Sequence, residues 1–152
     1  MKVDKWLVHR AGLVVVAGEL ALRGAAVAET RTVFGGGLRV TWPDGSVVDF
    51  VVMASSQSRW QFRDVGLLDA RPPDRPTFFS LTDVSAPLAR TYVIPVLGMG
   101  EIARAAEKNW RDRHGGERPE NDLSRHVLIE PRHVTEYDGR WDIVPVLTNI
   151  EH

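Results

Sequence analysis

The segment 47–65, VVDFVVMASSQSRWQFRDV, constrains the fold of this chain more than any other stretch. Its apolar ends, VVDFVVMA and RWQFRDV, have the β-branched and aromatic content of strands, and the polar run SSQS between them is typical of a turn. Because strand side chains alternate between two faces, Gln61 and Arg63 share one face, opposite the aromatic residues of WQF. The segment therefore predicts a hairpin, with Asp49 near the start of its first strand.

The rest of the chain alternates helical and extended patterns. Apolar residues at nearly every position predict a helix over 5–23 that is buried on more than one side. Pro95 indicates that the strand around it lies near a sheet edge. A second helix is expected over 98–110, and a short one after Pro131. Strands are expected over 25–34, 38–42, 47–54, 59–65, 77–81, 90–97 and 126–129, with the glycines 35–37 as an interruption. This order predicts an α+β fold.

Composition limits the classes of protein that fit. A length of 152 residues is typical of a single domain, here spanning 1–152. A net charge of −1 argues against a nucleic-acid binder that is basic over a whole face, and leaves room for a local basic patch. The absence of cysteine excludes disulfides and thiolate metal sites and fits a cytoplasmic protein. The sequence contains no run of about 18 apolar residues, so no membrane span is expected.

The order of these elements resembles the PD-(D/E)XK nuclease superfamily, which has the restriction-endonuclease-like fold. The stretch VAGELALRGAAVAETRTV is similar to that superfamily's first helix running into its first strand. VVDFVV is similar to the strand that bears its Asp, and RWQFRDV stands where members show E-x-K or Q-x-K. TYVIP and TEYDGRWDIV resemble the C-terminal part of small bacterial members. The resemblance covers roughly residues 9–97 and implies a nuclease-like domain with a central mixed sheet flanked by helices.

The resemblance also implies a catalytic site for phosphodiester hydrolysis. Asp49 corresponds to the metal-binding Asp, Gln61 to the second ligand and Arg63 to the Lys, while Glu19 corresponds to an accessory acid of some members. The expected cofactor is Mg²⁺, which prefers hard oxygen ligands, polarises the phosphate and activates a bound water. Its expected ligands are Asp49, Gln61 and Glu19.

Two of these positions depart from the superfamily pattern. Gln61 offers a neutral oxygen, so one formal charge is lost and the affinity for magnesium should fall. Arg63 is effectively always protonated and suits the holding of a phosphate rather than proton transfer. An alternative without catalysis is that Arg63 forms an ion pair with Glu19 or Asp49, with Glu19 the favoured partner. In a further alternative, Asp49 is a turn or edge residue, and Gln61 and Arg63 are solvated.

One more departure concerns the connection after the predicted hairpin. The superfamily places a helix between the strand of the x-K motif and the next core strand. Residues 66–89 contain four prolines, which fit a full crossover helix poorly. The chain therefore has either a short helix here or a different strand assignment.

The remaining motifs indicate little chemistry. The five histidines show no metal-ligand spacing. The basic residues of 104–113 alternate with acidic ones, which is typical of a solvated helix face. Trp110 and Trp141 are expected to be buried, with exposed stacking rings as the alternative.

Three functional hypotheses follow. The first is a degraded nuclease-like domain that binds nucleic acid or a protein partner with little or no cleavage. The second is an active metal-dependent nuclease with an atypical D-x11-Q-x-R site. The third is a small interaction or assembly module without a nucleic-acid role. A homodimer through the first helix or the edge near Pro95 is compatible with each.

Overall fold

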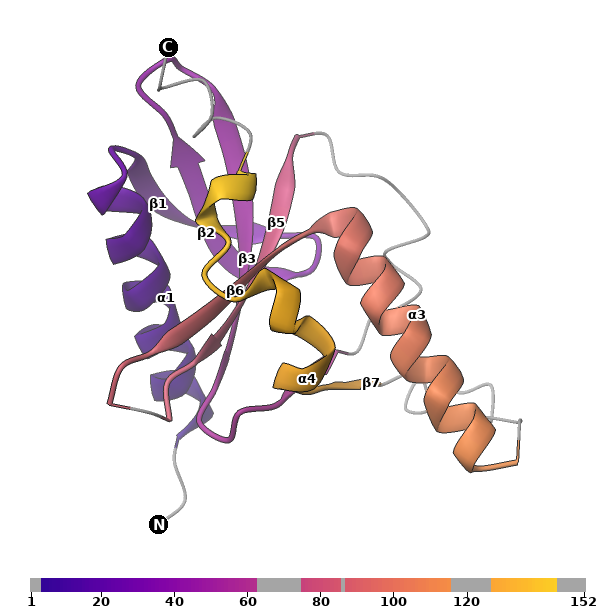
Figure 1. The fold of residues 1–152 in the computed structure, drawn as a ribbon. Coiled ribbons are helices and arrows are strands. Elements are labelled where there is room, and N and C mark those ends of the chain that lie inside the picture. The colour runs from indigo at the N-terminus through magenta and orange to yellow at the C-terminus, as the bar shows by residue number, and fades with distance from the viewer. Residues whose placement is uncertain (1–3, 63–74, 86, 116–126, 145–152) are drawn as a thin grey trace.

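The computed structural model describes residues 4–62, 75–85, 87–115 and 127–144. Its centre is a five-stranded sheet in the order β1-β2-β3-β5-β6, flanked by helices (Figure 1). The strands are β1 (Ala26–Thr32), β2 (Gly35–Thr41), β3 (Val47–Ser55), β5 (Thr77–Asp83) and β6 (Arg90–Pro95). Strands β3 and β5 are parallel, and the other neighbouring pairs are antiparallel. The predicted α+β fold with a mixed central sheet is confirmed, and it is consistent with restriction-endonuclease-like architecture.

The remaining elements lie around this sheet. They are α1 (Lys5–Leu22), β4 (Trp60–Phe62), α3 (Val96–Arg113), β7 (Val127–Ile129), α4 (Pro131–Val134) and the 3₁₀ turns η2 (Thr135–Tyr137) and η3 (Trp141–Ile143). Asp4 begins α1 by accepting a hydrogen bond from the backbone N–H of Trp6 at 2.8 Å. Within the described residues, no helix has the length and hydrophobicity needed to cross a bilayer.

The two faces of the sheet carry separate hydrophobic cores. On one face, Leu13 and Val16 of α1 pack in a cluster with Phe50 of β3. On the other face, Val51 packs in a second cluster with residues of α3, β4 and β7, including Met99. Because side chains alternate along β3, Asp49 shares the face of Val51 and lies on the opposite side of the sheet from α1.

The expected helix over 5–23 is present, but it is not buried on more than one side. Only residues directed at the sheet are fully buried; they are Gly12, Leu13, Val16 and Leu20. The opposite side of α1 is exposed and apolar, with Val14 67% exposed. The expected edge position of Pro95 is confirmed, because it ends β6 at the border of the sheet.

Two strand predictions are wrong. Strand β4 does not form a hairpin with β3, because it pairs antiparallel with β7 in a separate two-stranded sheet. The glycines 35–37 do not interrupt a strand, since all three belong to β2. Residues 63–74 lie outside the described part of the chain, so the expectation about a crossover helix stays untested over 66–74, while the described part of 66–89 contains strand β5.

Candidate functional site

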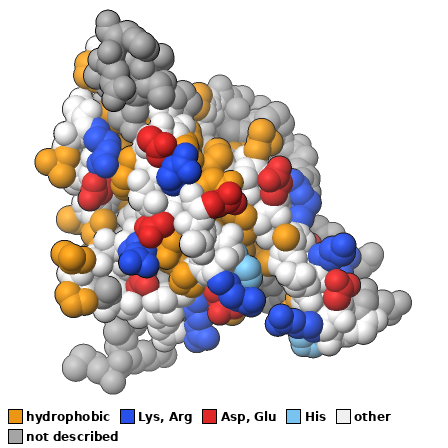
Figure 2. Space-filling model, viewed as in Figure 1, with side chains coloured by type: hydrophobic (Ala, Val, Ile, Leu, Met, Phe, Trp, Pro, Cys, Tyr) orange, Lys and Arg blue, Asp and Glu red, His pale blue; other side chains and the backbone are white. Residues whose placement is uncertain are grey.

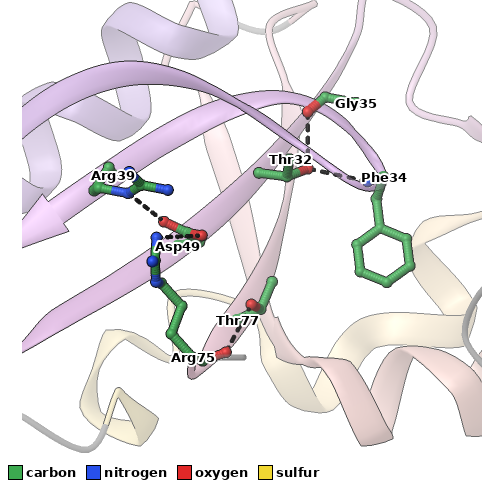
Figure 3. A network of polar contacts seen from close by, with 7 residues as sticks. All are labelled: Thr32, Phe34, Gly35, Arg39, Asp49, Arg75 and Thr77. Atoms are coloured by element: carbon green, nitrogen blue, oxygen red, sulfur yellow. Dashed lines mark hydrogen bonds and ion pairs between the residues drawn. The ribbon is translucent and has the colours of Figure 1, made fainter. Parts of the chain in front are cut away.

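Asp49 lies near the start of β3, and two arginines hold its carboxylate (Figure 3). Arg39 sits opposite Asp49 in the β2–β3 register and donates from Nε to Oδ1 at 3.3 Å. Arg75 precedes β5 and donates from Nη1 to Oδ2 at 3.4 Å. The Asp49 side chain is only 14% exposed. Two strands and the residue leading into β5 therefore converge on one half-buried carboxylate.

This arrangement opposes cation binding at Asp49. Each carboxylate oxygen already accepts a charge-assisted hydrogen bond, which is the stronger class of such bonds. A divalent cation would have to displace a guanidinium while a second positive charge stays nearby, and like charges repel strongly at such distances. The two arginines leave the cluster with a net positive charge, which suits an anion better than a magnesium ion.

Glu19 is separated from Asp49 by the sheet, because it belongs to α1 on the other face. Its Oε2 accepts a hydrogen bond from Arg23 Nη1 at 2.7 Å. The Arg23 guanidinium in turn lies 5.0 Å from the ring centroid of Trp141. Among the described residues, the partner of Glu19 is thus Arg23, one helical turn away. The expectation that Arg63 pairs with Glu19 stays a prediction, because Arg63 lies outside the described residues.

Gln61 lies on β4, where its side chain is exposed between buried Trp60 and Phe62. Strand β4 follows the end of β3 that is remote from Asp49. The structure therefore does not bring Glu19, Asp49 and Gln61 together as the sequence predicted. Among the described side chains, no three His, Asp or Glu residues lie close enough together to hold a metal ion.

A different site combines aromatic rings with cations. The end of α3, strand β7 and helix α4 enclose a hollow of about 180 Å³, called here the α3–α4 hollow. The His114 ring stacks on Trp110 with centroids 4.2 Å apart and an 11° angle between planes. His114 Nδ1 also lies 2.8 Å from the backbone oxygen of Trp110. Trp110 is 37% exposed, so the expectation that it is buried is wrong.

Positive charge gathers around these rings. Arg113 and Arg132 line the α3–α4 hollow, and both are exposed. Among the described residues that line it, the acid is Glu130, whose carboxylate pairs with Arg132 at 3.2 Å. Sequence reasoning treated this helix face as merely solvated. The signal that could have identified the site is the helical spacing of Trp110, Arg113 and His114, which places all three on neighbouring turns.

His133 connects the α3–α4 hollow to the short helix α4. Its Nδ1 accepts a hydrogen bond from the backbone N–H of Glu130 at 3.0 Å, completing a capping box. Burial and the nearby Arg132 guanidinium lower the pKa of His133 below its ordinary value of 6.5, and the Glu130 carboxylate offsets them only in part. The neutral imidazole, with its hydrogen on Nε2, is therefore the form that the fold favours.

This lowered pKa predicts a pH-dependent stability. Between the folded pKa and about 6.5 the unfolded chain binds more protons at His133 than the folded chain does, so acidification favours unfolding. The free energy of unfolding is expected to fall as pH drops below about 6.5, and His133→Asn should flatten this slope, because an amide oxygen accepts the same hydrogen bond without titrating. Urea unfolding at several pH values measures the difference. Equal slopes for both proteins would contradict the assignment.

No family model, curated protein or solved structure matches this chain. The functional proposal below therefore rests on the side-chain geometry and on the arrangement of the sheet.

Proposed function

We propose that this chain is a nuclease-like α+β domain that binds single-stranded nucleic acid without cutting it. The observation that carries the binding half of the proposal is the stacked Trp110–His114 pair beside Arg113 and Arg132. The observation that carries the non-cleaving half is the Asp49 carboxylate held by Arg39 and Arg75.

Sheet topology supports the loss of cleavage. In the superfamily that this chain resembles, the x-K motif precedes the crossover to the next core strand. The strand that crosses over to a parallel neighbour here is β3, so the corresponding motif is Asp49-Phe50-Val51 rather than a motif on β4. Val51 then stands in place of the Lys, and it is 2% exposed in an apolar core. On this correspondence the motif has neither a lysine nor a carboxylate that is open to a cation.

The α3–α4 hollow supports the binding of a flexible single strand of nucleic acid. A base can stack on an exposed flat ring, and such stacking tolerates any base identity. Arg113 and Arg132 stand beside the rings, where they can contact the phosphates of the same strand. Duplex DNA presents its bases edge-on within the grooves, so an exposed ring pair suits a single strand better. A local cationic site of this kind is also compatible with the overall charge of −1.

Binding to a labelled single-stranded oligonucleotide tests the proposal. Two phosphate contacts predict that affinity falls about sevenfold between about 50 mM and about 200 mM salt. Trp110→Ala should weaken binding at least about fivefold through lost stacking, and the pair Arg113→Ala and Arg132→Ala should abolish most of the salt dependence. The control is Arg31→Ala, which removes an exposed arginine of β1 remote from the hollow. Affinity that is independent of salt, or lost equally in the control, would contradict the proposal.

Cleavage is tested separately with plasmid and single-stranded DNA in the presence of Mg²⁺ or Mn²⁺. We expect intact substrate, because Asp49 is neutralised by its two arginines. Cutting that disappears in Asp49→Ala would instead support the active-nuclease hypothesis. Cutting that persists in Asp49→Ala would indicate a contaminating nuclease.

The third hypothesis, an assembly module, is favoured by one specific observation. The outer side of α1 is apolar and exposed. Self-association through α1 and the binding of single-stranded nucleic acid use different surfaces, so both can occur in one protein. The salt dependence described above decides whether nucleic acid is a ligand at all.

A further inference from the structure

The outward side of α1 carries a continuous apolar row where a surface helix normally carries charges. The chain has no charged residue between Arg10 and Glu19. Trp6 and Leu22 flank the row at its two ends, and both are more than half exposed. The row, called here the α1 seam, consists of exposed Leu7, Ala11, Val14, Gly18 and Ala21. Figure 2 shows hydrophobic side chains gathered over this part of the molecule.

The spacing of the α1 seam is that of a helix–helix contact. Its members follow one another by four, three, four and three residues, which is the heptad spacing of apolar residues in paired helices. Helices that pack in this way cross at about 20°. Three of the five members are Ala or Gly, so a facing helix can approach closely. Nothing in the inner packing of α1 requires this pattern, because the inner contacts use Leu13, Val16 and Leu20.

We propose that the α1 seam binds the α1 seam of a second copy of this chain, with the two helices antiparallel. A two-fold axis beside Val14 makes the seam self-complementary, as an isologous interface requires. Val14 then faces its own counterpart, and Leu7 lies over Ala21 of the other copy. Ala11 and Gly18 meet between these contacts. Each large side chain is thus matched with a small one, except at the centre.

Side-chain size favours the antiparallel over the parallel arrangement. Antiparallel pairing matches Leu7 with the small Ala21, whereas in-register parallel pairing would place Leu7 against Leu7 and leave Ala21 against Ala21. Arg10 borders the seam, where it is 41% exposed and pairs within its own copy with Glu29.

The area of the seam is sufficient for a specific weak dimer. Trp6, Leu7, Val14 and Leu22 are each more than half exposed. Leu7, Val14 and Leu22, together with the small members, would bury on the order of 500 Å² per copy, or roughly 1,000 Å² in total, which is the size of a weak, transient interface. We therefore expect a dimer with a dissociation constant in the micromolar range.

Sedimentation equilibrium from about 1 µM to about 100 µM tests the association. The wild-type chain is expected to change from monomer to dimer over this range. Val14→Glu should weaken association at least about tenfold, because it places two carboxylates at the centre of the interface. The matched control is Val33→Glu, since Val33 is 74% exposed in the β1–β2 turn. Both positions are exposed, so circular dichroism should show a native fold for each variant.

Single cysteines test the direction of pairing, because the chain contains no natural cysteine. Val14→Cys should form a disulfide-linked dimer on mild oxidation, and Leu7→Cys alone should not. A mixture of Leu7→Cys and Ala21→Cys should give the mixed dimer. Efficient self-linking of Leu7→Cys would overturn the antiparallel register.

Three outcomes would overturn the proposal as a whole. One is a wild-type chain that stays monomeric at about 100 µM, where a micromolar dimer must be populated. Another is a Val33→Glu variant that loses association as strongly as Val14→Glu does. The third is a monomeric wild-type chain that floats with lipid vesicles and is released from them by Val14→Glu, which would assign the seam to a membrane surface. Because Val14 does not line the α3–α4 hollow, these results are independent of oligonucleotide binding.

Discussion

Replacement of Gly37 by alanine is expected to destabilise the fold by about 3 kcal/mol, the upper end of typical overpacking costs. A Cβ at this position would lie 2.0 Å from the backbone oxygen of Phe50 and 3.0 Å from its carbonyl carbon. These are backbone atoms of the neighbouring strand, so no side-chain rotation can relieve the contact. Strands β2 and β3 would have to separate locally. Urea unfolding, followed by circular dichroism, measures the change.

The neighbouring Gly36 provides the control. A Cβ there would meet His9 at 3.0 Å, and the contact is with the far end of a flexible side chain. Gly36→Ala should therefore cost less than about 1 kcal/mol. Equal stabilities for the two variants would show that the close approach of β2 to β3 is not a constraint on the fold.

The Gly37 contact also bears on the candidate site. Arg39 follows Gly37 by two residues on β2 and lies opposite Asp49 in the register. A local separation of β2 from β3 should therefore loosen the pairing of Arg39 with Asp49. If Gly37→Ala still folds, its Asp49 carboxylate is held less firmly than in the wild-type chain.

Gly12→Ala is expected to destabilise the protein by about 2 kcal/mol, although alanine favours a helix over glycine by about 1 kcal/mol. A Cβ on Gly12 would lie 2.5 Å from the Cβ of Ala54 and 3.4 Å from a methyl group of Val52. The closest atom belongs to a short side chain that cannot move away. Helix α1 would therefore have to lift from β3, exposing part of the core around Phe50.

Gly18 lies on the same helix and faces outward, with no atom within 4 Å of an added Cβ. Gly18→Ala should therefore stabilise the monomer by about 1 kcal/mol through helix propensity alone. The decisive result is that the free energy of unfolding falls for one glycine substitution and rises for the other on the same helix. Both changes are measured by the same unfolding experiment. Destabilisation by Gly18→Ala, or tolerance of Gly12→Ala, would contradict the packing of α1 described above.

The candidate site was harder to predict than the fold, for a physical reason. Asp49 was correctly placed near the start of a strand, because alternation is a local property of the sequence. Its partner Arg75 is 26 residues away and reaches Asp49 only because β5 lies beside β3. The sequence pattern predicts that Gln61 lies in the same sheet as Asp49. The pattern of a short apolar strand, however, does not show which strand pairs with it. Strand β4 instead pairs with β7, which follows much later in the chain.

Helix α1 also shows that a local sequence pattern does not identify the surfaces that an element contacts. Its apolar residues all round predicted burial on more than one side, and periodicity alone cannot tell whether a second partner lies in the same chain. In the described part of the chain, the sheet and the residues around Trp141 cover the inner side of α1, and the outer side is exposed. The apolar residues all round therefore predict a second contact that the described residues do not provide, and the proposed pairing of two copies is one way to supply it.

By itself, the amino-acid sequence determined the helices and most strands, the edge position of Pro95 and the α+β class, because these depend on periodicity, proline geometry and turn residues within short windows. Only the tertiary structure decided which strands are neighbours, on which face of the sheet Glu19 and Asp49 lie, and which charges pair. Those features depend on contacts between residues far apart in the chain, and one change of strand partner moves a side chain to a different site without altering any local pattern.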